Sequence, residues 1–501
     1  MRTRLEDLLK DTKYRLICGG LDTETGDIIW DSREVKEGDV FVAVIGRVDG
    51  TKYVPSSIDS GASVIVIDEH QSIYTDDGLK ALAAPKDIAV VELPDSRRGL
   101  GILAANKFNH PERSLELYGV TGTKGKTTSA FMLHMILQRA GRMPGLMGTA
   151  GTIMGDKRVH TEYTTSEAPL TYKFMGELRD NGYDSFVMEA SSLGLKFERD
   201  YGLHYKAGCF TNFFRDHVGG IEHPDEEDYF RSKLIIFDHS DYGVVNLDCS
   251  RADEVCEYAS ARCHVVTYSI ADERADLRAT DMVRCIKDGV SGTTFTLVIG
   301  DDRYTVFVPI PGIFNVYNAL CALSCAHIAG IDMNVAAEAV GFVRVPGRLE
   351  PVHNDKGINV LVDYAHNGES LASAIGTVRE FTKGKVITVF GAGGERPAER
   401  RWDMGRISGE MSDYSIITTD NPRAEDPIKI IDEILEGIDQ TDGLYESIPD
   451  RRTAILRGLR LAVEGDTVLI AGRGHEDYQD LDGKIVYLDD REVAKEFFAN
   501  E

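Results

Sequence analysis

Short apolar runs alternate with amphipathic stretches along most of the chain. Residues 40–45 (VFVAVI) and 63–68 (SVIVID) are compact apolar runs of the kind that form buried strands, and helical segments lie around them. Beyond residue 344, the runs GINVLVDY, KVITVFGA, YSIITTD and DTVLIAG alternate with helical segments in the same way. Strand–helix alternation favours parallel, doubly wound sheets. The pattern therefore predicts an α/β protein.

The length of 501 residues predicts three domains, because a domain usually holds roughly 100–200 residues. A new block opens at 114–120 (SLELYGV), where a strand pattern runs into a turn rich in Gly, Thr and Lys. It closes after the helical run NVYNALCALSCAHIAG, with Asn315 as the N-cap and Gly330 just beyond the helix end. We expect an N-terminal α/β domain (1–112), a central P-loop ATPase-like domain with a parallel sheet (113–343) and a C-terminal Rossmann-like domain (344–501).

The strongest local signal is the turn TGTKGKTT, which follows the strand ending at Val120 and precedes a helix over about 127–140. A glycine-rich turn in that position holds phosphates with backbone N–H groups and the helix dipole. The strict Walker spacing would place glycine at Val120, so the loop is a variant, and a purely structural glycine turn is the alternative. The expected nucleotide-binding residues are Gly122, Thr123, Lys124, Gly125, Lys126, Thr127 and Thr128. Lys126 would reach the β- and γ-phosphates, and Thr127 would bind magnesium.

A second feature of the same site is the strand pattern DSFVMEASS (184–192), which ends in Glu189. A carboxylate at the carboxyl end of a parallel strand beside a phosphate loop is well placed to bind magnesium. Asp216 and His217 follow another apolar run. Each residue alone is also explained as an ordinary polar side chain. Together they predict a nucleotide–metal site.

The composition limits the partners. The formal net charge is −26, from 82 acidic against 56 basic side chains, which disfavours binding to nucleic acid or anionic lipid. The N-terminus carries acids within its short apolar stretch, and no apolar run approaches the roughly 20 residues that span a bilayer. We expect a cytoplasmic protein with no membrane partner. The eight cysteines contain no C-x-x-C pair, so reduced thiols are expected, without disulfides or a zinc ribbon.

With these residues the chain resembles the Mur ligases, in particular the branch that extends UDP-N-acetylmuramoyl-L-alanyl-D-glutamate. The resemblance covers nearly the whole chain in order. Its motifs are Asp31-Ser32-Arg33, the phosphate loop, Thr164-Thr165-Ser166, Met188-Glu189-Ala190-Ser191-Ser192, Thr211-Asn212, Arg215-Asp216-His217, Asn315–Asn318, Pro346-Gly347-Arg348, Asp363-Tyr364-Ala365-His366-Asn367, Asp420-Asn421-Pro422-Arg423 and Gly472-Arg473-Gly474-His475-Glu476.

The resemblance implies an ATP-dependent ligase that needs Mg²⁺. A substrate carboxylate attacks the γ-phosphate to give an acyl phosphate, and an incoming amine displaces phosphate to form an amide. The implied catalytic residues are Lys126, Glu189, His217 and Lys233, and the implied metal ligands are Thr127, Glu189, His217 and a carbamylated Lys233. Without the family, Lys233 would be interpreted as a surface lysine on an amphipathic helix.

The resemblance also divides the substrates among the three domains. The N-terminal domain would bind the UDP-precursor, the central domain ATP, and the C-terminal domain the added amino acid. The residues implied for the precursor are Ser32, Thr165, Ser166, Ser192 and Arg199. Asn318, Arg348 and His366 would contact the base or ribose of the nucleotide, although the asparagine and the histidine are equally explained as structural side chains. The ligase is expected to act as a monomer.

The added amino acid is expected to be meso-2,6-diaminopimelate, because Asp420-Asn421-Pro422-Arg423 matches the pattern of the enzymes that add it. Arg423 and Arg401 would bind the distal carboxylate, and Glu476 and Asn421 would receive the distal ammonium. The same segment is otherwise a turn, which explains Asn and Pro but leaves the arginine unexplained. The remaining residues implied for this substrate are Asp420, Pro422 and Gly472.

Four alternatives stay open or are set aside. Lys124 stands where many members have asparagine, and similar loops occur in relatives that add L-lysine. Leu193 replaces a common histidine or glutamine. A folylpolyglutamate synthase-like ligase would lack the Asn-Pro-Arg element, and a non-catalytic nucleotide-binding scaffold would not need the retained catalytic set. The cluster GAGGERP (391–397) follows a strand, but Arg396 occupies the third glycine of a dinucleotide fingerprint, so NAD binding is rejected.

Overall fold

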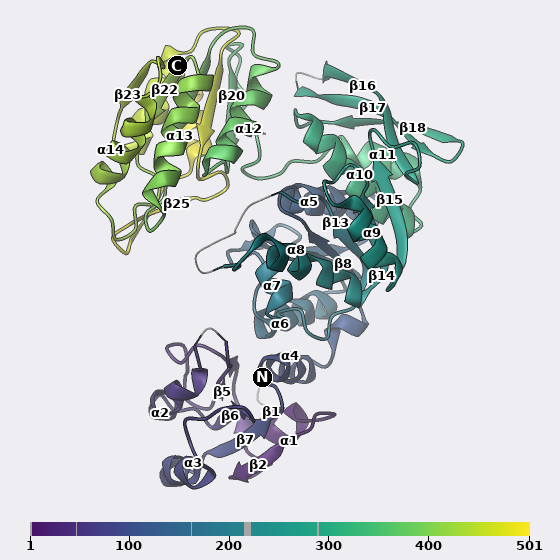
Figure 1. Ribbon diagram of the computed structural model, residues 1–501, viewed down its shortest axis with the longest axis vertical. Helices are drawn as coiled ribbons and strands as arrows, with labels where there is room; N and C mark the ends of the chain where they lie inside the picture. Colours follow the sequence, from purple (N-terminus) through teal and green to yellow (C-terminus); the bar gives the residue numbers. More distant parts are fainter. Residues whose placement is uncertain (1–2, 47, 162, 215–221, 288–289, 501) are drawn as a thin grey trace. The chain divides into compact units, whose positions relative to one another are not determined.

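The computed structural model describes residues 3–46, 48–161, 163–214, 222–287 and 290–500 (Figure 1). The chain forms two compact units. The first contains 1–280, 297–304 and 317–339, and the second contains 281–296, 305–316 and 340–501.

The N-terminal part of the first unit is built on a five-stranded sheet with the order β2-β7-β6-β5-β4. Strands β4 to β7 are parallel, and β2 joins antiparallel at the edge. The strands are β2 (Arg15–Cys18), β4 (Ile28–Ile29), β5 (Val40–Val42), β6 (Val64–Asp68) and β7 (Ala89–Leu93), and β1 (Thr3–Arg4) pairs separately with β3 (Glu24–Thr25). The helices are α1 (Leu5–Leu8), η1 (Gly50–Tyr53), α2 (Val54–Asp59), α3 (Asp76–Ala83), η2 (Ala84–Lys86), α4 (Ser96–Lys107) and η3 (Pro111–Arg113).

The largest sheet has eleven strands in the order β11-β10-β9-β12-β8-β13-β14-β15-β16-β17-β18. The strands are β8 (Glu116–Thr121), β9 (Pro144–Gly148), β10 (Gly151–Met154), β11 (Lys157–Val159), β12 (Ser185–Glu189), β13 (Tyr205–Phe210), β14 (Ser240–Asn246), β15 (His264–Ser269), β16 (Leu277–Lys287), β17 (Val290–Ile299) and β18 (Asp302–Val308). Its helices are α5 (Lys126–Arg139), α6 (Ala168–Asp180), α7 (Ser192–Lys196), α8 (Glu226–Leu234), η4 (Ile235–His239), α9 (Ala252–Ser260), α10 (Ile313–Ile328) and α11 (Met333–Val340).

The last 150 or so residues form a six-stranded sheet with the order β19-β20-β24-β21-β22-β23, parallel except for β19. The strands are β19 (Glu350–Pro351), β20 (Asn359–Asp363), β21 (Val386–Phe390), β22 (Tyr414–Ile417), β23 (Tyr445–Ser447) and β24 (Thr467–Ala471), and β25 (Tyr478–Leu481) pairs with β26 (Lys484–Tyr487). The helices are α12 (Gly368–Arg379), α13 (Ala398–Met411), α14 (Pro427–Ile438), α15 (Arg451–Leu461) and α16 (Asp490–Ala499). Helices α12, α13 and α14 lie side by side (Figure 1).

Buried apolar strands explain this architecture. All residues of β6, β12, β21 and β24 are buried, as parallel strands covered on both faces require. Helix α14 buries Ile430, Ile431, Ile434 and Ile438, which recur at the helical period. The predicted α/β class is confirmed. The domain boundaries after residues 112 and 343 stay predictions.

The structure corrects two details of the sequence analysis. The central sheet is mixed, because β10 pairs antiparallel with both β9 and β11. Helix α10 begins at Ile313, so Asn315 lies inside its first turn and is not the N-cap, whereas Gly330 (φ +69°) follows the helix end as expected. All eight cysteines are free. In the part of the chain that the structure describes, no helix is both long and apolar enough to cross a bilayer.

Candidate active site

The glycine-rich turn connects β8 to α5, as the sequence predicted. Gly125 immediately precedes the helix with φ +87°, a left-handed conformation that glycine adopts without steric cost. A β-carbon on Gly125 would also lie 2.3 Å from Oδ1 of Asn318, so the turn is closely packed. The strand, turn and helix therefore have the arrangement in which backbone N–H groups and a helix N-terminus bind phosphate.

Two lysines meet at one carbonyl oxygen of this turn. Nζ of Lys126 donates to the carbonyl of Gly122 over 2.9 Å and to that of Thr123 over 3.1 Å. Nζ of Lys233, from α8, donates to the same Gly122 carbonyl over 3.0 Å and lies 4.2 Å from the centre of the Tyr229 ring. Lys233 is only 1% exposed, so its interpretation as an ordinary surface lysine is wrong.

Glu189 lies at the carboxyl end of β12 and is completely buried. Its carboxylate accepts hydrogen bonds from the hydroxyl of Thr127 over 3.0 Å and from the backbone N–H and hydroxyl of Thr149 over 2.9 and 3.2 Å. The register of β12 with β8 pairs Glu189 with Val120, which brings the two strand ends together. Thr149 was not predicted from the sequence, because it lies in a turn without a recognisable motif.

The chemistry of this oxygen group fits magnesium. Two hydroxyls and one carboxylate lie together beside the phosphate turn, and Mg²⁺ prefers oxygen ligands while keeping several waters. Among the described residues, no group of three or more His, Cys, Asp and Glu side chains is arranged to hold a metal. The predicted ligand His217, with its neighbours Arg215 and Asp216, lies outside the described residues.

Residues that follow β13 stabilise the phosphate turn through hydrogen bonds. The hydroxyl of Thr211 and the amide of Asn212 both donate to the carbonyl of Lys124, over 2.7 and 3.0 Å. The Asn212 side chain also accepts from the Lys124 N–H over 2.9 Å. Asn318 accepts from the Ser129 hydroxyl over 3.3 Å, so it packs against the turn and the start of α5. Thr211 and Asn212 appeared in the sequence only as a motif without an assigned role.

Four of the residues predicted for the UDP-precursor lie near one another. Thr165 donates to the carbonyl of Glu189 over 2.9 Å and accepts from the N–H of Ser191 over 2.8 Å. Arg199 donates to the carbonyl of Thr165 over 3.0 Å. Ser166 and Ser192 follow Thr165 and Ser191 directly in the sequence, and both are buried. Ser32 makes none of these contacts and lies half-buried in the turn between β4 and β5.

Arg199 also belongs to a charged group that the sequence did not reveal. Its Nε lies 3.0 Å from Glu167, a carboxylate that is 4% exposed and is also bound by Arg97 from α4. The guanidinium of Arg199 stacks 4.7 Å from the Tyr163 ring. These contacts fix the orientation of Arg199 before any ligand binds.

In the second unit, the residues predicted for the amino acid gather after β22 and β24. The amide of Asn421 donates to Glu476 over 2.8 Å, and its carbonyl accepts from the N–H of Asp480 over 2.9 Å. A β-carbon on Gly472 would lie 2.3 Å from the carboxylate of Asp420, so only glycine allows this approach. Pro422 is buried, and its carbonyl closes a turn by accepting from the N–H of Glu425.

The carboxyl group of Glu476 is unusual for a glutamate. Burial, together with the nearby charge of Asp420, raises its pKa to about 7. The hydroxyl of Tyr364 lies 3.3 Å from one of its oxygens. A carboxyl group with such a pKa, held by Asn421 and Tyr364, is suited to receive a cationic group.

The two arginines predicted to bind a carboxylate differ in the structure. Arg423 has a left-handed backbone (φ 53°), its side chain is 39% exposed, and one weak contact of 3.4 Å joins it to Glu395. Arg401 is buried and paired with Glu425 (2.9 and 3.0 Å) and Glu433 (2.7 Å). The guanidinium of Arg401 therefore already has two carboxylate partners, and its contact with the amino acid stays a prediction. Arg396, in the loop before α13, is the exposed arginine of this region.

Arg348 and His366, predicted to contact the nucleotide, both lie against Tyr364. The guanidinium of Arg348 lies 5.0 Å from the centre of the Tyr364 ring, and the His366 ring lies 4.7 Å from it. Nδ1 of His366 is 2.7 Å from the Tyr364 carbonyl. The structure thus brings these two residues together within the second unit.

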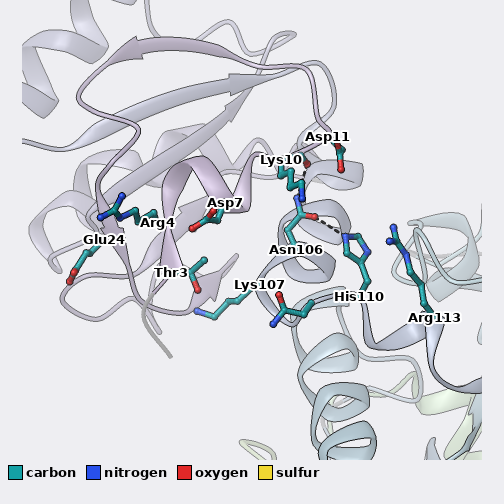
Figure 2. Close-up of a pocket in the computed structure, with 11 residues that line it drawn as sticks. Thr3, Arg4, Asp7, Lys10, Asp11, Glu24, Asn106, Lys107, His110 and Arg113 are labelled. Carbon is teal, nitrogen blue, oxygen red and sulfur yellow. Dashed lines mark hydrogen bonds between the residues drawn. The ribbon is translucent and has the colours of Figure 1, made fainter.

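A cavity of about 610 Å³ lies elsewhere, in the N-terminal part of the chain (Figure 2). It is lined by residues of both charges, among them Arg4, Asp7, Lys10 and Arg113. Figure 2 shows His110 beside Asn106, and their side chains are 3.0 Å apart. None of the predicted site residues lines this cavity, and its mixed charge does not favour one class of ligand.

Comparisons with known proteins agree with this geometry. Residues 120–326 match the Mur ligase middle domain, and residues 347–474 match the Mur ligase, glutamate ligase domain. The chain is 38% identical over 493 residues to the UDP-N-acetylmuramoyl-L-alanyl-D-glutamate--2,6-diaminopimelate ligase of Clostridium botulinum, covering 98% of both chains. It is 37% identical over 500 residues to the ligase of that name from Clostridium tetani, covering 98% of this chain and 99% of the other.

Among solved structures, a UDP-N-acetylmuramoyl-L-alanyl-D-glutamate--2,6-diaminopimelate ligase superposes with a TM-score of 0.67 at 26% identity, covering 100% of this chain and 99% of the other. The two domain matches together span more than half of the chain, and the relatives match it from end to end. This chain belongs to the Mur ligase family.

Proposed function

We propose that the protein is an ATP-dependent ligase that adds meso-2,6-diaminopimelate to UDP-N-acetylmuramoyl-L-alanyl-D-glutamate. The relatives carry this activity in their names. The observation that carries the proposal is the convergence of Lys126 and Lys233 on the Gly122 carbonyl, beside the Thr127–Glu189 pair. That group supplies charge where a phosphoryl group would be transferred.

The reaction proceeds through an acyl phosphate. An oxygen of the precursor's glutamyl carboxylate attacks the γ-phosphorus of ATP, and the bond to the β-phosphate oxygen breaks to release ADP. The amine of the amino acid then attacks the acyl carbon, loses a proton and displaces inorganic phosphate. Because charge spreads over the phosphoryl oxygens during transfer, positioning and charge neutralisation supply most of the catalysis. Lys126, whose Nζ donates to the carbonyls of the phosphate turn, would provide a fixed cation for this step.

Thr127 and Glu189 are the residues that would hold Mg²⁺, with Thr149 orienting the carboxylate. When bound, the ion would neutralise charge on the β- and γ-phosphates. His217 is proposed as a further ligand on the family resemblance alone. The buried carboxylate of Glu189 is the contribution of this chain that makes the site attractive to a cation.

Lys233 is proposed to be carbamylated. Two ammonium groups that donate to one carbonyl oxygen repel each other. The neutral amine of Lys233 would attack CO₂ and release one proton, forming an N-carboxylate. The repulsion is then replaced by attraction between this anion and Lys126, and the new carboxylate becomes a candidate ligand for the magnesium ion.

The precursor is assigned to Ser32, Thr165, Ser166, Ser192 and Arg199. Arg199 is the cation of this group, and its contacts with Glu167, Thr165 and Tyr163 hold its guanidinium in one orientation. A planar guanidinium binds carboxylate or phosphate through paired N–H groups. Asn318, Arg348 and His366 remain proposed contacts of the nucleotide, Asn318 through its packing on the phosphate turn.

The amino acid is assigned to the residues around Glu476. Arg423 would bind the distal carboxylate and Glu476 the distal ammonium, oriented by Asn421. Arg401 is proposed as the second cation, and its contacts with Glu425 and Glu433 hold its guanidinium in one orientation. Asp420, Pro422 and Gly472 are proposed to shape the backbone around this site. Addition of L-lysine instead would leave Arg423 unpaired.

The remaining assignments rest on the family resemblance. The proposed division of labour is precursor binding by 1–112, ATP binding by 113–343 and amino-acid binding by 344–501. The protein is proposed to work as a monomer in the cytoplasm.

The decisive experiment measures phosphate release from ATP with the UDP-precursor and a panel of amino acids. We expect release with meso-diaminopimelate and at most weak release with L-lysine. Preference for lysine would support the alternative amino acid while keeping the ligase. Release with a folate and glutamate would favour a folylpolyglutamate synthase-like enzyme, and no release with any acceptor would favour a non-catalytic scaffold. Lys157→Ala, at an exposed lysine of β11, is the matched control for a Lys126→Ala variant in the same assay.

A further inference from the structure

A hydrogen-bonded chain of side chains begins at Ser192. The hydroxyl of Ser192, the first residue of α7, lies 2.9 Å from Nε2 of His223. Nδ1 of the same ring lies 2.6 Å from a carboxylate oxygen of Asp228 on α8. Lys196, at the end of α7, donates to both oxygens of Asp228 over 2.6 and 2.8 Å. His223 is 1% exposed, whereas the Lys196 and Asp228 side chains are 30% and 28% exposed, so this row of side chains runs from the surface to a buried ring.

The hydrogen-bond network fixes where the protons lie. Burial raises the pKa of Asp228, but the hydrogen bonds from Lys196 and His223 outweigh this and hold it below its usual value, so the carboxylate is ionised and accepts only. Nδ1 of His223 must therefore carry hydrogen. Burial lowers the pKa of His223, which keeps the ring neutral and leaves Nε2 as an acceptor. The single proton of the Ser192 hydroxyl is consequently donated to Nε2.

A serine whose proton points inward offers only lone pairs to a ligand. Such a hydroxyl accepts a hydrogen bond from an N–H group, and it repels a carboxylate. The hydroxyl of Thr165 likewise uses its hydrogen within the protein, since it donates to the carbonyl of Glu189. Arg199, whose guanidinium donates to the carbonyl of Thr165, is then the group of this site that would bind an anion.

We propose that His223 and Asp228 are positioning residues that fix the Ser192 hydroxyl as a hydrogen-bond acceptor for an amide N–H of the precursor's dipeptide. This inference rests on the proposed function, because it concerns the substrate that Ser192 is assigned to bind. It adds to that assignment which part of the substrate Ser192 recognises. It also gives a role to two residues outside the predicted site.

The test replaces one amide N–H of the precursor by an ester oxygen, which cannot donate. Two such analogues are compared with UDP-N-acetylmuramoyl-L-alanyl-D-glutamate, one with the ester before alanine and one with it before glutamate. Binding to the full chain is measured by calorimetry without ATP, so that turnover does not contribute. For the wild-type protein we expect one ester to bind about tenfold more weakly than the amide, the usual effect of one hydrogen bond.

The variants separate recognition from structural support. In Ser192→Ala, the amide and the ester should bind within about twofold of each other, because the acceptor is gone. In Asp228→Asn, Lys196 should keep its hydrogen bond to the side-chain carbonyl of the new asparagine, so the amide N–H of that side chain faces Nδ1 of His223. Nδ1 must then accept, and the ring hydrogen of His223 moves to Nε2. The Ser192 proton then turns outward, and the preference for the amide should disappear. A residue that only supports the fold would weaken both ligands equally.

A matched control exists in the same unit. His204 and Asp241 form an exposed pair at 2.8 Å, and Asp241→Asn should change neither affinity nor the ratio. If Asp228→Asn does not fold, ¹⁵N-histidine spectra of the wild-type chain, assigned with His223→Gln, report the tautomer directly. Hydrogen on Nε2 of His223 would overturn the proposal.

The outcomes also separate this inference from the proposed function. An amide preference that persists in Ser192→Ala, or equal weakening of both ligands by Asp228→Asn, would overturn the inference while the ligase assignment stands. Failure of the wild-type chain to bind the amide precursor itself would count against the proposed function.

Discussion

The hydroxyl of Thr127 donates to the carboxylate of Glu189 over 3.0 Å, although 62 residues separate them in the chain. Thr127 lies in the first turn of α5, and Glu189 ends β12. Because β8 and β12 are adjacent parallel strands, their carboxyl ends meet at one edge of the sheet. This edge is where the proposed phosphoryl transfer would take place.

Glu189→Gln should abolish most activity with little effect on the fold. Glutamine keeps the shape and can still accept from the N–H of Thr149, but it lacks the charge that attracts Mg²⁺. We expect kcat/KM to fall about 100-fold or more, as when one electrostatic contact to a transition state is lost. The dependence of the rate on Mg²⁺ concentration should shift to higher concentrations. An unchanged magnesium dependence would argue against Glu189 as a ligand.

Lys126→Ala should also abolish ligation without destabilising the protein strongly, since Nζ of Lys126 donates to the Gly122 and Thr123 carbonyls of the turn and is not part of the apolar core. A variant that retained more than about a tenth of kcat/KM, a loss below roughly 1.4 kcal/mol, would contradict the assignment. The free energy of unfolding, measured in urea, checks that the fold is intact. Lys157→Ala should behave as the wild type in both measurements.

The carbamate on Lys233 predicts a dependence on dissolved CO₂. Activity should fall when bicarbonate is removed and return when it is added back. ¹³C-bicarbonate should give a carbamate signal in the NMR spectrum of the wild-type protein that is missing in Lys233→Arg, because guanidinium does not react with CO₂. A signal of equal size in both proteins would place the carbamate elsewhere.

The sequence predicted the phosphate turn well because its information is local. The strand, the turn and the helix lie within about 25 residues, and the observed α5 (Lys126–Arg139) begins one residue from the predicted start. The helix boundary at Asn315 was less accurate, because Ile313 and Phe314 extend α10 ahead of the polar residue that resembled a cap. Helix ends depend on packing as well as on capping residues.

Contacts between distant segments could not be predicted in this way. The sequence did not reveal that Glu425 and Glu433, which lie on following segments, pair with Arg401. Likewise, the burial of Lys233 depends on α8 packing against the phosphate turn, which the helical pattern alone did not reveal. A periodic pattern indicates which face of a helix is apolar, but the partner of a charged side chain depends on the tertiary fold.

The raised pKa of Glu476 predicts a pH effect on binding of the amino acid. Its pKa of about 7 means that the carboxyl group is largely protonated at pH 6 and largely ionised at pH 8. Since only the ionised form attracts an ammonium group, the KM for diaminopimelate should decrease as the pH rises through 7. The KM for ATP should not follow this step. In Glu476→Gln the step should vanish, and its persistence would assign the titration to another group.

The specificity for the amino acid depends on which arginines face it. Arg423→Ala should raise the KM for meso-diaminopimelate far more than the KM for ATP, because truncating one partner of a charged pair typically costs about 2–5 kcal/mol. Arg401→Ala should act in the same direction and should also lower the thermal stability, since it would leave Glu425 and Glu433 without their buried cation. A competition assay with diaminopimelate and L-lysine completes the test. L-Lysine has no distal carboxylate and would leave Arg423 unpaired, so Arg423→Ala removes this penalty. The preference of the enzyme for diaminopimelate over L-lysine should therefore become smaller. If Arg423→Ala left the preference for diaminopimelate over L-lysine unchanged, Arg423 would not be the residue that distinguishes the two amino acids.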